Sequence, residues 1–574
     1  MNLRALRLPP VASGRFDPQY GVFLALILII GGFVLYPVLT VFIGSFHNET
    51  SLGVPAAWSL DAWRTALSEP GMRAAIGNTV QVLLATESIA MPVAIVIAWL
   101  LARTDLPAGR SLEFLFWISF FMPALAVTLG WVVLLDPAAG VLNNLAKSLP
   151  FVEAGPFDIY SFGGIVWAHL STQAISVKVM LLTPSFRNLD AAFEEAARVS
   201  GATRWQTLAR VVIPAAVPAV LTVLVLSVIR VLQTFEIEMA LGPPFKFFVF
   251  GTMIFRLVEQ SPPQFGPAAA LAAMVFAIVT PLILLHRFLI TRKDYTSITG
   301  RIRATPTRLG RWRVPIFAVV CLFVATITVL PIGFVSISSI MKLFGFFNIA
   351  EPWTLDHWRR ILNDSFFVHS LGITMTVAGS VAIGSMVFCT LVAYFAIRSR
   401  YVGRGLLDFL SWLPFTIPGI LLGIGILYVV LGNPVFRPLY GTLLLLVLAL
   451  MVAHMTLGIQ IVKSAILQLG TSLEEAARTS GATWWYCLRK IMVPILAPTL
   501  VLVGVVNFIA ATRDIASVAL LASNNTKTLS LLQLDYMTDG QLESGAVISV
   551  VLIALTTGIA FGARLFGLKM GIRG

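Results

Sequence analysis

Charged residues and cysteines are both scarce in this sequence of 574 residues. Only 12% of the residues are charged, whereas 58% are hydrophobic and the mean hydropathy is +0.89. This apolar content exceeds what the core of a water-soluble domain requires, so the solvent of the chain is lipid. The cysteines Cys321, Cys389 and Cys487 lie far apart, without the spacing of a disulfide or a metal cluster. We expect them to be small buried hydrophobic residues.

Motifs for nucleotide binding and catalysis are also missing. No lysine follows a glycine, so the chain lacks the Gly-Lys-Ser/Thr loop that cradles nucleotide phosphates. It contains no His-Glu-x-x-His, Cys-x-x-Cys or Gly-x-Ser-x-Gly pattern either. We therefore predict no catalytic residues, no metal site and no cofactor.

The sequence contains long apolar runs instead. A bilayer core about 30 Å thick requires roughly 20 apolar residues in a helix. The first run is too long for a secretory signal, and we interpret it as a retained helix. The runs predict an all-α polytopic membrane protein with two tandem six-helix bundles. They lie near residues 21–45, 75–102, 113–136, 161–184, 212–235 and 264–288, then near 314–340, 370–397, 405–431, 441–466, 492–515 and 543–566.

Basic residues gather in the short loops on one side of these spans, which indicates the cytoplasmic side and places both termini there. The net charge of +13 is then explained by topology and by attraction to anionic lipid headgroups, and not by nucleic-acid binding. The predicted parts are a cytoplasmic segment at 1–20, a first six-helix half at 21–288 (core 74–288), a basic cytoplasmic linker at 289–313, a second six-helix half at 314–566 (core 369–566) and a cytoplasmic tail at 567–574.

An internal repeat is the strongest feature of the sequence. The twelve residues from Glu194 to Trp205 match those from Glu474 to Trp485 at ten positions, with an offset of 280. Pro214 recurs as Pro494 at the same offset. The halves are therefore duplicates, and the repeated segment lies between the fourth and fifth spans of each half.

The repeated segment has the signals of a short helix. Good helix formers from Glu194 to Ala197 are followed by Gly201, which can end a helix in the left-handed conformation. Thr203 can cap the next helix, and Pro214 falls where that helix enters the membrane. Such a segment could simply float on lipid headgroups. Its duplication argues instead for two equivalent docking surfaces.

The spacing of this segment resembles a known motif. Glu-Ala-Ala, three residues and a glycine, followed by an aliphatic residue shortly before proline, is similar to the cytoplasmic coupling motif of binding-protein-dependent ABC importer permeases. The resemblance covers both halves and implies a type I importer fold. The residues that it assigns to ATPase coupling are Glu194, Glu195, Ala196, Ala197 and Gly201, with Glu474, Glu475, Ala476, Ala477 and Gly481.

The resemblance also implies partners and a mechanism. A cytoplasmic ABC ATPase dimer would seat the two coupling helices, and a periplasmic substrate-binding protein would deliver the solute. No second permease chain is needed, because both halves are fused. Transport would proceed by alternating access across a bacterial inner membrane. A proton-coupled secondary transporter also has six plus six helices but needs no paired coupling helix, and a membrane-embedded enzyme lacks a catalytic constellation.

Ionisable residues near the outer end of the fifth spans are candidates for the translocation pathway, because charges are costly in lipid. They are Arg230, Glu236 and Glu238 in the first half and Arg513 and Asp514 in the second. Aligning Glu236 with Asp514 predicts two carboxylates near one axis, which would attract a cation. The alternative is that Arg513 neutralises Asp514 and Glu236 is merely an interface residue.

Two further pairs repeat with equal spacing. His169 precedes Lys178 by nine residues, and His454 precedes Lys463 by nine. We expect the lysines to extend toward the cytoplasm and the histidines to form hydrogen bonds between helices. Glu87, within the second span, has no partner that the sequence indicates.

The expected substrate follows from a resemblance to one branch of these permeases. A fused chain of this size resembles the ferric iron branch of the importer permeases, through Phe235-Glu-Ile and the segments 261–266 and 295–300. Related branches carry 2-aminoethylphosphonate, thiamine or polyamines. The expected substrate is ferric iron.

Overall fold

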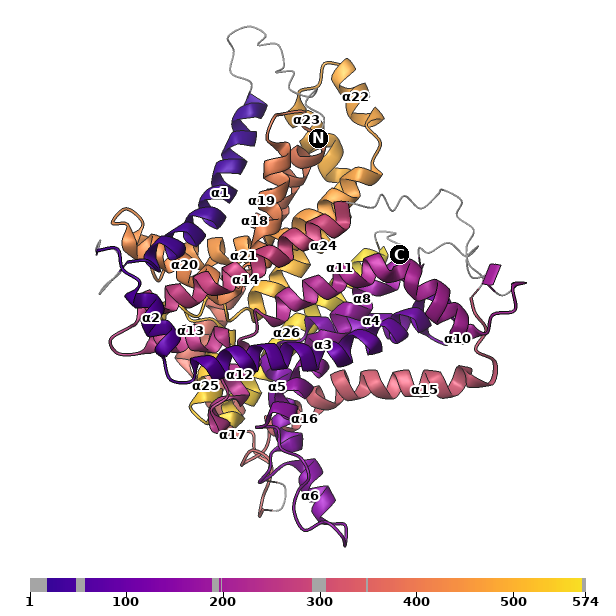
Figure 1. Ribbon diagram of the computed structural model, residues 1–574, viewed down its shortest axis with the longest axis vertical. Coiled ribbons are helices and arrows are strands. Elements are labelled where there is room, and N and C mark those ends of the chain that lie inside the picture. The colour runs from indigo at the N-terminus through magenta and orange to yellow at the C-terminus, as the bar shows by residue number, and fades with distance from the viewer. Residues whose placement is uncertain are drawn as a thin grey trace.

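The computed structural model describes residues 18–47, 57–187, 196–197, 199–291, 306–346 and 349–569. Within these ranges the ordered structure is helical, and the only β-pairing is three isolated bridges. Ten helices are long and apolar enough to cross a membrane, and two bent helix pairs raise the number of candidate spans to twelve (Figure 1). The prediction of an all-α polytopic protein is confirmed.

The helices follow the predicted runs, with short helices between them. The first half contains α1 (Pro18–Gly44), α2 (Asp61–Ser68), α3 (Met72–Arg103), α4 (Gly109–Phe121), α5 (Ala124–Leu135), α6 (Val141–Lys147), α7 (Phe162–His169), α8 (Ile175–Arg187), α10 (Arg204–Thr207), α11 (Ile213–Val231), α12 (Glu236–Leu241), α13 (Phe250–Glu259) and α14 (Phe265–Thr291). The second half contains α15 (Arg313–Val324), α16 (Leu330–Ser338), α17 (Asp356–Asn363), α18 (Ser365–Arg398), α19 (Arg404–Thr416), α20 (Gly419–Gly432), α21 (Leu443–Gln468), α22 (Ser472–Thr479), α23 (Trp484–Cys487), α24 (Val493–Arg513), α25 (Leu529–Thr538) and α26 (Leu542–Lys569).

The third span of each half is broken and not continuous. Helices α4 and α5 meet at 96°, and α19 and α20 meet at 111°. The break in each half falls where a residue precedes a proline: Met122 before Pro123, and Ile417 before Pro418. The proline ring disfavours the helical conformation of the residue before it, so both residues take extended backbone angles and the chain turns.

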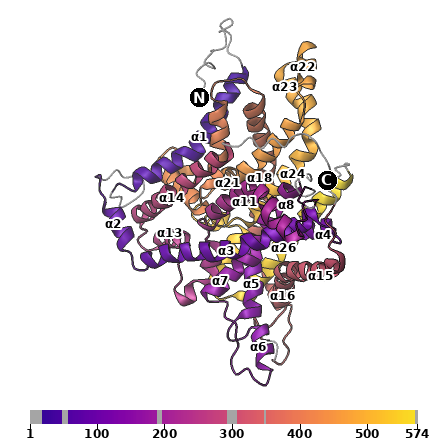
Figure 2. The same cartoon turned by 45° about the vertical axis from the view of Figure 1, so that its right-hand side comes forward.

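The first span of each half packs on the opposite half. Helix α1 lies against α19 and α20 (Figure 1), whereas α16 lies against α5 (Figure 2). Both contacts bring a proline of the first span against a glycine. Pro37 approaches Gly425 so closely that a Cβ at Gly425 would lie 3.0 Å from the Pro37 carbonyl oxygen, and Pro331 approaches Gly130 in the same way. The two halves are therefore interlocked.

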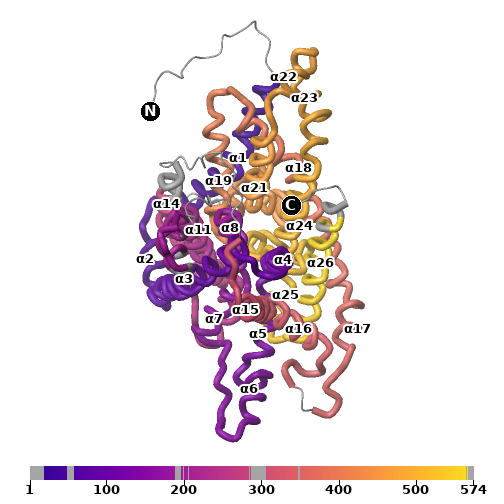
Figure 3. The backbone as a smooth tube through the Cα atoms, turned by 90° about the vertical axis from the view of Figure 1, so that its right-hand side faces the viewer, coloured from indigo at the N-terminus to yellow at the C-terminus, as the bar shows by residue number. Residues whose placement is uncertain are grey.

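The molecule is elongated, and its two ends differ. Helix α22 lies at one end of the long axis and α6 at the other in each view (Figures 1 and 3). The segment around α6 is held together by Asn143, whose amide donates to the carbonyls of Asp136 and Phe157 at 2.8 Å. Large apolar side chains are exposed on it, and Phe151 is 94% exposed.

Candidate functional site

The repeated segment of the second half ends its helix at a left-handed glycine. Gly481 has a φ of +83°, and the Ala482 N–H donates to the Ala477 carbonyl at 3.0 Å. This hydrogen bond satisfies a carbonyl that the end of α22 leaves free. No atom lies within 4 Å of a Cβ built on Gly481, so the backbone conformation, and not crowding, favours glycine there.

The first half repeats this geometry where it is described. Gly201 has a φ of +81°, and the Ala202 N–H donates to the Ala197 carbonyl at 3.0 Å. The left-handed conformation predicted for Gly201 is confirmed. Glu194 and Glu195 lie outside the described residues.

Threonine caps start the helices that follow. The Thr203 hydroxyl accepts from the Gln206 N–H, and the Thr483 hydroxyl accepts from the Tyr486 N–H, both at 3.3 Å. In each half a π-helical turn then leads into the membrane helix, α11 or α24, which has a proline in its first turn. The predicted capping role of Thr203 is confirmed.

The two glutamates of α22 point in different directions. Glu474 is buried, and its Oε1 lies 2.9 Å from Arg398 Nε at the end of α18. Glu475 and Ala476 are exposed, and Trp485 beyond the turn is 52% exposed. Glu474 therefore fixes α22 to the membrane helices, whereas Glu475 and Ala476 are available to a partner. No pattern in the sequence had indicated Arg398 as the partner of Glu474.

The lysine prediction is wrong. Lys178 is buried, and its Nζ donates to Glu87 Oε1 at 2.9 Å and to the Ala174 carbonyl at 3.0 Å. An ammonium group at this depth is stabilised by a carboxylate from α3 more than by reaching toward headgroups. Glu87, which had no partner in the sequence, is thus paired with Lys178. Lys463 likewise pairs with Asp408 of α19.

The histidines form the predicted contacts between helices. His169 Nε2 lies 2.8 Å from Glu238 Oε1, and His454 Nε2 lies 3.0 Å from Asp514 Oδ2. The carboxylate that faces the repeated histidine is therefore Glu238 in the first half and Asp514 in the second. Among the described residues, no group of three or more His, Cys, Asp or Glu side chains could hold a metal ion.

Two arginines, one from each half, reach across the interface between the halves. The Arg230 guanidinium carbon lies 4.8 Å from the centre of the Phe415 ring, and that of Arg513 lies 5.1 Å from the centre of the Phe120 ring. Arg513 also donates to the carbonyls of Phe120 and Met122. The phenylalanines had not been predicted, although each stands three residues before the proline that breaks a third span.

Both carboxylates of the predicted pair lie beside these arginines. Glu236 interacts electrostatically with Arg513 and Asp514, and it accepts a hydrogen bond from the Ile515 backbone. Asp514 accepts from the Ser517 N–H at 2.8 Å. The structure thus brings Arg230, Glu236, Arg513 and Asp514 together, whereas Glu238 is fully buried beside its histidine.

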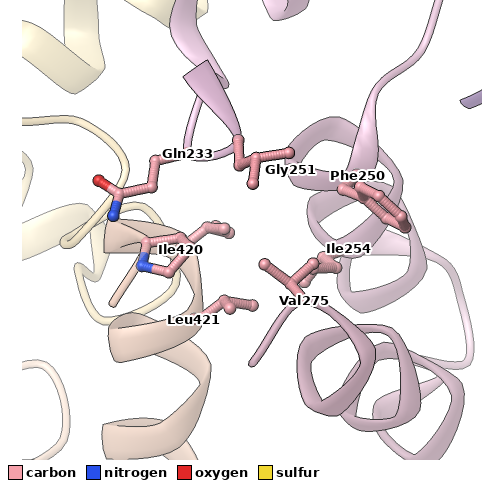
Figure 4. A pocket seen from close by; sticks show the side chains of 9 residues that line it. Gln233, Phe250, Gly251, Ile254, Val275, Ile420 and Leu421 are labelled. Atoms are coloured by element: carbon pink, nitrogen blue, oxygen red, sulfur yellow. The ribbon is translucent and has the colours of Figure 1, made fainter. Parts of the chain in front are cut away.

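A small pocket adjoins this cluster at the junction of α11, α13, α14 and α20 (Figure 4). Gln233 is the most polar side chain around it, and its Nε2 donates to the Phe415 carbonyl at 3.3 Å. The lining carries no charged side chain. It is formed by Leu232, Gln233, Phe250, Gly251, Ile254, Val275, Pro418, Ile420 and Leu421.

Duplicated halves, up to twelve candidate spans among the described residues and a helix, α22, that projects at one end of the molecule fit a polytopic membrane permease. Residues 90–295 and 385–570 each match the binding-protein-dependent transport system inner membrane component family. The chain belongs to this family, and the two matches make it a fused double permease. Membership sets aside the secondary transporter and the membrane enzyme.

Known relatives are permease components of transporters. The chain is 25% identical to the probable ABC transporter permease protein y4fN of Sinorhizobium fredii, over 94% of both chains. It is 22% identical to the ferric transport system permease protein FbpB of Actinobacillus pleuropneumoniae, over 93% of this chain and 77% of that one. It is also 26% identical to the sulfate transport system permease protein CysT of Escherichia coli, over 44% of this chain and 91% of that one.

Proposed function

We propose that the chain imports ferric iron, delivered by a periplasmic substrate-binding protein, and that a separate ABC ATPase dimer drives transport by docking on the two repeated helices. The observation that carries this proposal is the duplicated segment that ends at Gly201 and Gly481. Both glycines have the same left-handed conformation and are followed by the same threonine cap. Two copies of one surface suit two identical subunits.

The chemistry of α22 supports docking. Glu474 and Arg398 form an ion pair that ties the helix to α18, so force applied to the helix would reach the membrane bundle. Glu475 and Ala476 face outward beside the exposed ring of Trp485. Large aromatic side chains that remain exposed are typical anchors at protein interfaces.

In this proposal the docking helices and both termini lie in the cytoplasm, as the basic loops favour. The end of the molecule that carries α6 would then face the binding protein. The solute would pass between the halves, near Arg230, Glu236, Arg513 and Asp514. Iron is proposed because the ferric permease FbpB matches nearly the whole chain, whereas the sulfate permease CysT matches less than half of it.

Co-purification and uptake test this proposal together. The tagged chain, extracted from its own membranes, should bring down an ATP-binding protein, and cells that express it should take up radiolabelled ferric iron. Glu475→Lys, which reverses an exposed charge, should reduce both the recovered ATPase and the uptake by about tenfold. A tenfold loss corresponds to about 1.4 kcal/mol, less than a central interface residue contributes.

Arg437→Glu is the matched control, since it reverses an exposed charge in the loop after α20, on the side that should face away from the ATPase. It should leave ATPase recovery unchanged. Equal ATPase recovery with the Glu475→Lys variant and the wild type would refute the docking role. Iron uptake that survives depletion of ATP would refute the ATP-driven mechanism.

A further inference from the structure

The Arg230 side chain is a cation without an ion-pair partner among the described residues. It lies in the last turn of α11 and is exposed. Its side chain forms no ion pair and no hydrogen bond with any residue that the structure describes, and its guanidinium lies over the face of the Phe415 ring. Asp514 attracts it through space without reaching ion-pair distance.

Arg513 brings a second guanidinium to the same place. It comes from the other half, at the end of α24, and it is close enough to Arg230 for the two charges to repel. The carbonyls of Phe120 and Met122 hold it in position. Two like charges are thus held together at the interface between the halves.

The neighbouring carboxylates already have donors. Asp514 receives the Ser517 N–H at 2.8 Å and the Ser517 hydroxyl at 3.1 Å, and His454 lies 3.0 Å away. Glu236 receives the Ile515 backbone N–H. Glu238 has one oxygen without a partner, but it is fully buried and out of reach of a solute. Arg230 keeps all five N–H groups of its side chain available to a solute.

We propose that Arg230 and Arg513 form an anion-binding site between the halves, so that the transported solute presents an oxyanion group there. The planar guanidinium matches the spacing of two oxygens of a phosphate, sulfate or carboxylate, and the second positive charge strengthens the attraction. This inference rests on the proposed passage of solute between the halves. It assigns a negative charge to the group that binds there, whereas the carboxylates alone would attract a cation. A ferric ion would pass this site with an oxyanion ligand still attached.

Binding of inorganic phosphate to the purified chain in lipid nanodiscs tests the site. At constant ionic strength, replacing chloride by phosphate should raise the thermal unfolding midpoint of the wild type. Arg230→Gln should weaken the phosphate response on the order of tenfold, the value of a charge-assisted hydrogen bond. Arg230→Lys, which keeps the positive charge but loses the planar guanidinium that can bind two oxygens at once, should give an intermediate response.

Arg256→Gln is the matched control, because Arg256 is also exposed and stacked on a phenylalanine, with its guanidinium carbon 5.1 Å from the centre of the Phe248 ring. It should respond to phosphate as the wild type does. A phosphate response that Arg230→Gln leaves unchanged, or a wild type without any response, would overturn the proposal. Because Arg230 has no partner whose loss would unfold the chain, the variant should express normally.

Uptake separates a free oxyanion from one bound to iron. Cells that express the chain receive either radiolabelled sulfate and phosphate or ferric citrate. The solute that wild-type cells take up is then offered to cells that express the Arg230→Gln variant. Loss of its uptake supports the site, and uptake equal to that of the wild type overturns it. The Glu475→Lys variant keeps the phosphate response of the purified chain while losing the ATPase, so the anion site and the docking proposal can fail independently.

Discussion

The repeated lysines obtain their counter-charges from different helices. Lys178 pairs with Glu87 of α3, whereas Lys463 pairs with Asp408 of α19. The first pair is nearly inaccessible, with side chains 2% and 9% exposed, and the Ser227 hydroxyl donates to the second oxygen of Glu87. A pair this deep is sensitive to the loss of one member, because the other charge then stays buried and uncompensated.

Glu87→Gln should therefore lower the free energy of unfolding by about 3 to 5 kcal/mol. The double replacement Glu87→Leu with Lys178→Met should cost much less, because neither charge remains. Thermal unfolding of the detergent-solubilised protein measures both. The control is Glu113→Gln at the more exposed pair with Arg187, where the loss should stay below about 1 kcal/mol. Equal destabilisation by the single and double variants would contradict the argument.

Residue types and spacing were sufficient to predict the histidine contacts but not the identity of their partners. His169 and His454 occur at equivalent places, yet Glu238 lies on a short helix after the fifth span and Asp514 directly caps α24. The partners of Lys178 and Arg398 come from positions 91 and 76 residues away in the chain. Pairing over such distances depends on how the helices pack. A single sequence contains no local pattern that shows this packing.

At the scale of elements, the glycine that ends α22 is required by its backbone angle. Gly481→Ala would place a Cβ in the left-handed region at a cost of roughly 1 kcal/mol, enough to shift the end of the helix. We expect transport-coupled ATP hydrolysis to fall several-fold while the thermal unfolding midpoint changes little. ATPase activity of the reconstituted complex measures this.

Gly71→Ala is a closely matched control for this substitution. Gly71 has a φ of +88° and, like Gly481, has no atom within 4 Å of a built Cβ, but it precedes α3 and is distant from α22 in sequence. It should carry the same backbone strain and leave coupling intact. If both variants uncouple equally, strain and not the docking helix is responsible.

Local signals were reliable for the elements. Apolar run length predicted the spans, and the glycine and threonine signals predicted the turn after the repeated helix. The broken third spans were missed, although Met122-Pro123 and Ile417-Pro418 are visible in the sequence. Proline inside an apolar run is common in membrane helices, as Pro92 in the continuous α3 illustrates, so proline alone does not separate a bend from a break.

At the scale of the whole molecule, the interlock between the halves depends on close backbone approach. Gly425→Ala would place a Cβ 2.9 Å from the Pro37 Cβ and force α1 away from α20. We expect a loss of about 1 to 3 kcal/mol, typical of overpacking. Thermal unfolding measures it.

Gly32→Ala serves as the control, since Gly32 lies in α1 with no atom within 4 Å of a built Cβ. It should be neutral or stabilising, because alanine favours helix more than glycine does. A Gly425→Ala protein as stable as the wild type would contradict the close packing of α1. The duplication was evident from the sequence, but the exchange of first spans was not, because each span is apolar on all sides and carries no signal of its neighbour.

This exchange has a consequence for biogenesis. Helix α1 leaves the ribosome before α19 and α20, the helices of the second half that pack on it, and these begin roughly 360 residues later. At 5 to 20 residues per second, the newly inserted helix waits about 20 to 70 seconds in the bilayer beside the translocon. Its Pro37 face meets lipid or a membrane chaperone during that interval, and assembly of the first half is completed only when synthesis of the second is well advanced.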